Sequence, residues 1–194
     1  MLKRGIALTP VKFGISFNVS HFNQAGALVH VYADGSVLVN HGGTEMGQGL
    51  NTKVAQVVAH ELGIDFARVR CTATDTSKVA NTSATAASTG ADLNGKAAED
   101  AARQIRQRLA ALFAGRHGVA EDAVRFAKGE VGAGSARERF EDLARAAYEA
   151  RVQLWSDGFY ATPGLSWDRE TMTGQAVLLL RLRRRGLRGR SWTR

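Results

Sequence analysis

Apolar and polar residues alternate along the early part of the chain, which is the pattern of strands that bury one face. Residues 13–22 and 25–33 are rich in β-branched and aromatic residues and predict two strands. Asp34-Gly35 is a turn signal of the kind that joins the strands of a hairpin. Residues 36–40 are therefore predicted to return as the next strand.

Three later segments place apolar residues three and four positions apart, the spacing of amphipathic helices. These predicted helices cover residues 52–62, 91–115 and 140–154. The residues predicted to face inward are Val54, Val57, Val58, Leu62, Ala97, Ala98, Ala101, Ile105, Leu109, Leu112, Phe140, Leu143, Ala147 and Leu154. On the outer face of the second helix, Glu99 and Arg103 are expected to form an i,i+4 ion pair.

The remaining segments carry weaker signals. Residues 68–73 and 158–162 predict two further strands, and residues 116–137 are interpreted as a surface connection. Residues 74–90 consist mostly of Thr, Ser, Ala and Asn. A solvated loop is the simplest interpretation of that segment, and a run of small side chains lying against a ligand is the alternative.

The composition describes a folded protein with one strongly charged end. The chain has 194 residues, 44% of them hydrophobic, and only two prolines, so it is one globular domain or a piece of something larger. A net charge of +8 is typical of proteins that bind nucleic acid or membranes. Residues 181–194, however, contain seven arginines and no acid, and without them 19 basic residues face 18 acidic ones. The nearly neutral body therefore favours neither nucleic acid nor a membrane as a partner.

Several kinds of site are excluded by residue counts and spacing. Cys71 is the only cysteine, so no internal disulfide and no metal site made of several thiolates can form. The apolar run near the start is too short for a signal peptide, and no apolar stretch approaches the length of a membrane span. A soluble, cytoplasmic location is therefore expected. The five histidines lack metal-ligand spacing, and Ser88 lacks the partners of a hydrolase nucleophile.

Four glycines lie within residues 41–50, between a predicted strand and a predicted helix. Glycine lets a ligand approach the main chain closely, and the first N–H groups of a helix can bind an anion. The segment therefore indicates either a phosphate-type site or an ordinary tight turn. Its glycine spacing matches neither of the two common nucleotide-binding fingerprints.

An ordered set of segments resembles the molybdenum-cofactor-binding subunit or domain of xanthine dehydrogenases. The matching segments are residues 12–17, 23–28, 34–39, 41–50, 82–88, 92–95 and 151–163. Coverage is almost continuous from residue 3 to about residue 176, apart from residues 116–137, so the set is more specific than any single motif. The resemblance implies that residues 1–176 form part of a molybdopterin-binding domain. Its implied fold class is α/β (mixed α+β), with sheets packed by helices.

The resemblance assigns cofactor-binding residues to two loops. Met46, Gly47 and Gln48 match a loop that contacts the molybdopterin through main-chain groups and the glutamine side chain. The residues that match the second cofactor loop are Thr85, Ala86, Ala87, Ser88, Thr89 and Gly90. Within that loop, Ala87 is the residue expected to lie next to the metal.

Phe17 and Asn18 are the implied substrate-binding residues. Phe17 matches an aromatic residue that packs against the flat substrate, and Asn18 stands where xanthine-oxidising relatives often carry a threonine. The implied reaction is the oxidative hydroxylation of hypoxanthine and xanthine to urate, with water as the oxygen source. The full enzyme would hold two 2Fe–2S clusters, FAD and NAD on other domains or subunits. The implied partners are thus a purine and the FAD/iron–sulfur subunit.

Two departures from the family pattern concern catalysis and the C-terminus. No acid of this chain matches the general-base glutamate, so no catalytic residue is assigned, and Glu45 is interpreted as a structural partner of its own loop. After residue 176 the family continues close to Phe-Tyr-Tyr-Phe-Ala-Tyr-Gly-Ala, whereas this chain has Val-Leu-Leu-Leu-Arg-Leu-Arg-Arg. Inserting one extra guanine before codons for the family's sequence shifts the reading frame and yields the sequence found in this chain. Residues 177–194 are therefore predicted to be a frameshifted, non-native tail, and the chain alone is predicted to be incomplete and inactive.

Three alternatives stay open at this point. They are an aldehyde oxidase-type molybdenum hydroxylase, an inactive truncated remnant, and a nucleic-acid-binding module supported by the basic tail alone. A remnant would expose the apolar faces of the helices at 91–115 and 140–154, because the segments that covered them would be absent.

Overall fold

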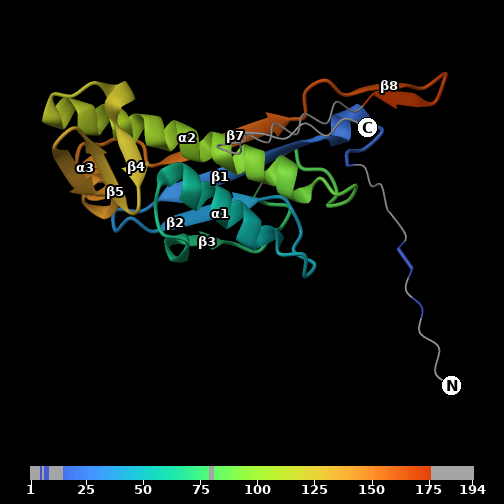
Figure 1. Ribbon diagram of the computed structural model, residues 1–194, viewed down its shortest axis with the longest axis horizontal. Coiled ribbons are helices and arrows are strands. Elements are labelled where there is room, and N and C mark those ends of the chain that lie inside the picture. Colours follow the sequence, from blue (N-terminus) through green and yellow to red (C-terminus); the bar gives the residue numbers. More distant parts are fainter. Residues whose placement is uncertain (1–4, 6, 9–14, 79–80, 176–194) are drawn as a thin grey trace.

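The computed structural model describes residues 5, 7–8, 15–78 and 81–175. A four-stranded sheet with two helices on one side forms the main body, and a smaller sheet with a third helix lies at one end (Figure 1). The helices are α1 (Leu50–Leu62), α2 (Gly90–His117) and α3 (Phe140–Glu149). The strands are β1 (Gln24–Val31), β2 (Val37–His41), β3 (Val69–Cys71), β4 (Arg125–Ala127), β5 (Glu130–Ala133), β6 (Ala136–Arg139), β7 (Trp155–Ala161), β8 (Ser166–Asp168) and β9 (Thr173–Gln175).

The main sheet has the strand order β3-β2-β1-β7. β1 pairs antiparallel with β2 on one side and with β7 on the other. Gly35 has a φ of +79° in the turn between β1 and β2, so the predicted hairpin is confirmed. β3 lies parallel to β2, which is possible because α1 crosses over the sheet between them.

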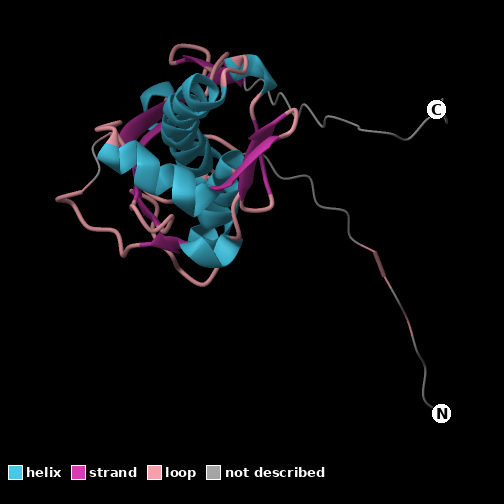
Figure 2. Ribbon diagram, turned by 90° about the vertical axis from the view of Figure 1, so that its left-hand side faces the viewer, coloured by secondary structure: helices cyan, strands magenta, loops and turns pink. Residues whose placement is uncertain are grey.

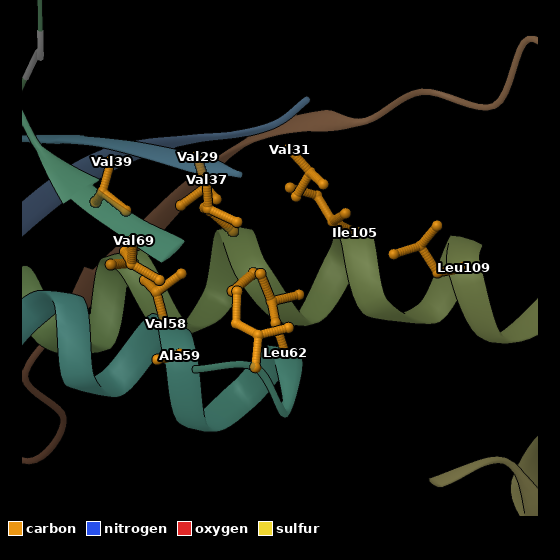
Figure 3. Close-up of a cluster of buried hydrophobic side chains, with 14 of the residues drawn as sticks. Val29, Val31, Val37, Val39, Val58, Ala59, Leu62, Val69, Ile105 and Leu109 are labelled. Carbon is orange, nitrogen blue, oxygen red and sulfur yellow. The ribbon is translucent and has the colours of Figure 1, made fainter. Parts of the chain in front are cut away.

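The hydrophobic core lies between this sheet and the helices α1 and α2 (Figure 3). Val29 and Val31 alternate with half-buried positions along β1 and are themselves buried. Leu62 of α1 and Ile105 and Leu109 of α2 are fully buried against the sheet. Strand residues two apart and helix residues three or four apart thus meet in one core, which confirms the three helical segments as amphipathic helices.

α2 lies close enough to β7 for backbone contact. A Cβ added to Gly158 would lie 2.1 Å from the Ala97 carbonyl oxygen and 2.5 Å from the Ala101 nitrogen. Ala97 and Ala101 are themselves fully buried. Gln104 reinforces the contact, because its Oε1 accepts a hydrogen bond from Ser156 Oγ at 2.7 Å. Small residues on both elements therefore set the position of the longest helix.

The smaller sheet was not expected from the sequence. Residues 116–137 are not a plain surface connection, because they contain β4, β5 and the start of β6. Val131 of β5 is fully buried, and Phe140 at the start of α3 is 1% exposed. Figure 2 views the molecule from the end that carries this sheet and α3. The strands were missed because each has only three or four residues, too few for a clear alternation.

Two predicted boundaries were wrong. Residues 15–22 contain no strand, and Ser20–Phe22 form a short 3-10 helix instead. The helix predicted to reach residue 154 ends at Glu149, and Arg151 then adopts a left-handed φ of +59°. Leu154 is still buried, although in extended chain before β7 rather than in the helix.

Three side-chain predictions on the helices also need correction. Glu99 pairs with Lys96, and Arg103 pairs with an aspartate three residues earlier, so the predicted i,i+4 ion pair does not form. Val57 and Leu112 are only half-buried. Phe113, one residue beyond Leu112, takes the core position and is fully buried.

The apolar faces of α2 and α3 are covered within the described residues, by the main sheet and by the small sheet. The exposure expected of a remnant is therefore not seen on these helices. On the open side of the main sheet, Trp155 is 50% exposed and Phe159 is 53% exposed. None of the helices in the described ranges combines the length and apolarity needed to cross a membrane. The predicted frameshifted tail, residues 177–194, lies outside the described residues and stays a prediction.

The contact between α2 and β7 makes Gly158 intolerant of any side chain. Gly158→Ala should lower the free energy of unfolding by about 3 kcal/mol, because the new methyl group meets backbone atoms that cannot move independently. Gly115→Ala is the matched control: Gly115 is exposed in α2 with open space around it, and alanine there should stabilise the helix by about 0.5–1 kcal/mol. Urea unfolding of both variants measures the two effects. Equal stability of both variants would refute the close approach of α2 to β7.

Candidate functional site

Two loops meet near the starts of α1 and α2, which lie toward the same side of the molecule (Figure 1). Residues 42–49 connect β2 to α1, and residues 81–89 lead into α2. Thr44 N donates a hydrogen bond to Thr85 Oγ1 at 2.8 Å. A Cβ on Gly42 would lie 2.2 Å from Thr82 Oγ1, so the loops can approach this closely only because residue 42 is glycine.

The Glu45 carboxylate organises the first loop. Oε1 accepts hydrogen bonds from Gly47 N and Gly49 N at 3.0 Å, and Oε2 accepts one from Asn51 N at 2.9 Å. The bond from Asn51 N, with those from the glycines, lowers the pKa of Glu45. These contacts agree with a structural role for Glu45. They also use the N–H groups at the start of α1, so this loop is a self-capped turn rather than an open phosphate site.

His41 holds the same loop from the buried side. It is 2% exposed, its Nδ1 accepts a hydrogen bond from Gly43 N at 3.1 Å, and its Nε2 lies 2.9 Å from Asn51 Oδ1. Because an amide N–H can only donate, Nδ1 must be unprotonated, and Nε2 carries the proton that Asn51 accepts. Burial lowers the pKa of His41 and favours this neutral form. Sequence reasoning missed both His41 and Asn51 as residues that shape the site.

The second loop has a strained backbone at its centre. Ala87 and Ser88 have φ values of +52° and +57°, a region that side chains other than glycine rarely adopt. Ser16 N donates to the Ala87 carbonyl oxygen at 3.1 Å and ties the N-terminal segment to this loop. Thr89 is buried, and its hydroxyl donates to the Ala86 carbonyl oxygen at 3.0 Å. Contacts from both sides therefore fix the strained residues in place.

A pocket of about 240 Å³ lies between the two loops. The residues that line it are Met46, Gln48, Leu50, Lys53, Thr85, Ala86, Ser88, Gly90 and Ala91. Six of the nine residues assigned to cofactor binding are among them, whereas Gly47, Ala87 and Thr89 are not. Leu50, Lys53 and Ala91 were not identified from the sequence, because single residues in the first turns of helices give no distinctive pattern.

The polar groups of the pocket suit a polar, anionic ligand. Lys53 is the only charged residue that lines it, and no carboxylate does. The Gln48 amide is folded back on its own loop, with Nε2 donating to the Thr44 carbonyl oxygen at 2.9 Å. Residues with small or no side chains, Ser88 and Gly90 among them, leave the space open. This donor set is compatible with a molybdopterin, for which Lys53, Gln48 and the loop hydroxyls would be the polar contacts.

Phe17 and Asn18 lie beside this pocket rather than in it. Buried Asn23 positions them, since its Oδ1 accepts from Phe17 N at 2.8 Å and its Nδ2 donates to the Phe17 carbonyl oxygen at 2.9 Å. Phe17 lines a cleft of about 370 Å³ together with Phe22, whose ring centroid is 5.6 Å away. Phe17 and Asn18 also line a smaller cleft of about 160 Å³ that includes Trp167.

The single thiol, Cys71, does not line the pocket. Cys71 donates from its Sγ to the Asn51 carbonyl oxygen at 3.4 Å, and burial raises its pKa to about 11. That thiol is thus protonated at neutral pH. Across the ranges that the structure describes, no group of three or more His, Cys, Asp or Glu side chains is placed to hold a metal ion.

The neutral state of His41 predicts a pH-dependent stability. Its folded pKa lies below the ordinary 6.5, so its contribution is complete above pH 6.5 and is lost as the pH falls through the folded value. Urea unfolding from about pH 8 to about pH 5.5 should show stability falling at the acid end. His41→Gln should remove most of that fall, whereas His60→Gln, an exposed control on α1, should keep it. The same pH dependence in both variants would show that His41 is not its source.

Comparisons with known proteins identify the family of the chain. The family model described as "Molybdopterin cofactor-binding domain" matches residues 1–179. The chain is 47% identical over 166 residues to the xanthine dehydrogenase of Blastobotrys adeninivorans, an alignment covering 86% of this chain and 10% of that protein. It is 46% identical over 172 residues to the xanthine dehydrogenase/oxidase of Mus musculus, covering 89% of this chain and 12% of that protein. The chain thus spans about a tenth of the length of these relatives.

Solved structures share the fold. Quinoline 2-oxidoreductase from Pseudomonas putida 86 has a TM-score of 0.66 at 25% identity, covering 71% of this chain and 19% of that one. CO dehydrogenase from Oligotropha carboxidovorans has a TM-score of 0.65 at 24% identity, covering 72% of this chain and 18% of that one, which is evidence of fold alone. With the family model and the xanthine dehydrogenase relatives, these findings show that the chain belongs to the molybdopterin cofactor-binding domain family of xanthine dehydrogenase-type oxidoreductases.

Proposed function

We propose that this chain supplies part of the molybdopterin site of a xanthine dehydrogenase, which oxidises hypoxanthine and xanthine to urate. The observation that carries the proposal is the pocket between the two loops. Residues 46–48 and residues 85–90 are separated by almost forty positions, yet members of both segments line one cavity. The family resemblance assigns both segments to the cofactor independently of their proximity in the fold.

The residues of the pocket would bind and orient the cofactor. When bound, the cofactor supplies the oxidising metal centre, and the protein supplies position and exclusion of water. Gln48 would exchange its bond to the Thr44 carbonyl oxygen for one to the pterin. The self-capping by Glu45 would hold Met46 and Gly47 in place whether or not a ligand is present. The strained backbone at Ala87 would present its small side chain toward the metal.

The substrate side of the site is proposed to lie around Phe17. Phe17 and Phe22 form an edge-to-face pair in their cleft, and aromatic walls of this kind favour a flat heterocyclic substrate. Asn18 offers both a donor and an acceptor to a purine in place of a threonine hydroxyl. The hydrogen bond from Ser16 N to the Ala87 carbonyl oxygen links this segment to the second loop, so substrate and cofactor would be held in a fixed relative position.

Other parts of the enzyme are proposed to complete the site. The general-base glutamate, two 2Fe–2S clusters, FAD and NAD would belong to segments or subunits beyond this chain. Relatives that are 46–47% identical to the chain are a xanthine dehydrogenase and a xanthine dehydrogenase/oxidase, which supports a purine substrate over an aldehyde. On this account the chain by itself does not turn over xanthine.

A chimeric enzyme tests the proposal. The matching segment of the mouse xanthine dehydrogenase/oxidase would be replaced by this chain's residues, and pterin and FAD would be measured in the purified protein. We expect pterin equimolar with FAD and formation of urate from xanthine. Gln48→Ala in the chimera should lower the pterin content, whereas Gln107→Ala, on α2 away from the loops, should leave it unchanged. A chimera that holds FAD fully but no pterin would contradict the proposal.

A further inference from the structure

Lys53 is a charged residue of the pocket to which the family resemblance assigned no role. It lies in the first turn of α1, and it is the only charged residue among those lining the cavity. Met46, Gln48, Thr85 and Ser88 share the cavity with it and are all neutral. The only formal charge among the residues lining the pocket is therefore the positive charge of the Lys53 ammonium group.

The Lys53 ammonium has no carboxylate within ion-pair distance among the described residues. Lys78 and Lys96, by contrast, are paired with Asp75 and Glu99. Glu45, the acid in the loop that precedes α1, directs its oxygens to backbone N–H groups instead. The arrangement that caps α1 thus leaves Lys53 available to an anion from outside the protein.

The opposite wall of the pocket offers hydrogen-bond donors. Thr85 Oγ1 accepts from Thr44 N, so its hydroxyl proton can still be donated. Among the described residues, none accepts a hydrogen bond from the N–H of Gly90 or Ala91, and both of these residues line the cavity. They begin a helix of 28 residues, whose dipole adds to the positive potential on that side. A phosphate between the two walls would meet Lys53 on one side and these donors on the other.

We propose that Lys53 binds the phosphate end of the pterin cofactor. This inference rests on the proposed function and extends it, because it names the group that neutralises the ligand's charge. It also changes where an anion would bind near residues 41–50, for which the glycine pattern indicated the first N–H groups of the following helix. The anion is held by a lysine side chain one turn into α1, not by the N–H groups that Glu45 already occupies.

A titration of the full 194-residue chain with inorganic phosphate tests the proposal without the pterin. Amide shifts in the ¹H–¹⁵N spectrum should change saturably at Lys53, Gly90 and Ala91. Lys53→Met should weaken phosphate binding about tenfold or more, the effect of losing one charged hydrogen bond, and Lys53→Arg should keep most of it. Lys96→Met is the control with the same change of charge outside the pocket. Lys53 is exposed, so its substitution should not unfold the chain. Unchanged amide shifts in the distant β4–β6 sheet will show that each variant is folded.

The outcomes separate this proposal from the proposed function. Phosphate shifts that are equal in Lys53→Met and the unchanged chain, or that fall outside the pocket, would overturn the role of Lys53 and leave the proposed function standing. In the chimera, Lys53→Met should also lower the pterin content per FAD, while Lys96→Met should not. A chimera without pterin, together with phosphate binding that depends on Lys53, would contradict the proposed function but not the anion site.

Discussion

The close contact between α2 and β7 is the constraint on which the rest of the structure depends. Gly158 has no room for a side chain because the backbone of Ala97 and Ala101 lies directly against it. This contact fixes the position of a helix that covers the sheet and also begins at the second loop. The same helix packs against α1, which begins at the first loop. The geometry of the pocket is therefore set in the core rather than in the loops themselves.

Within that frame, the two loops are held by polar contacts of their own. Glu45 caps α1 from within its loop, and neutral His41 holds Gly43 through Nδ1. The left-handed backbone at Ala87 and Ser88 is tolerated because its neighbours are tied on both sides. Contacts within the protein thus hold the backbone of both loops in one conformation, and such preorganisation would lower the entropy lost on binding a ligand.

The parts of the fold that follow from local patterns could be predicted from the sequence. The β1–β2 hairpin and the helices α1 and α2 have clear periods and turn or end signals. The short strands β4–β6 could not be predicted, because three or four residues are too few to show a periodic pattern. The end of α3 could not be predicted either, because the left-handed φ that follows it leaves no periodic signal in the sequence. The candidate site could likewise be predicted only in part. Family resemblance supplied its two loops, but the Thr44–Thr85 contact between them spans 41 positions and depends on tertiary structure. Lys53 was missed because a lysine on a helix surface is common, and its place in a pocket becomes evident only in three dimensions.

The measurement that tests this account most directly is the position of the metal. Crystals of the chimera, measured on both sides of the molybdenum absorption edge, would locate the molybdenum by its anomalous scattering. The account predicts one peak between the loop of residues 42–49 and the loop of residues 81–89, on the side of Ala87. A peak remote from either loop would show that this pocket does not receive the cofactor.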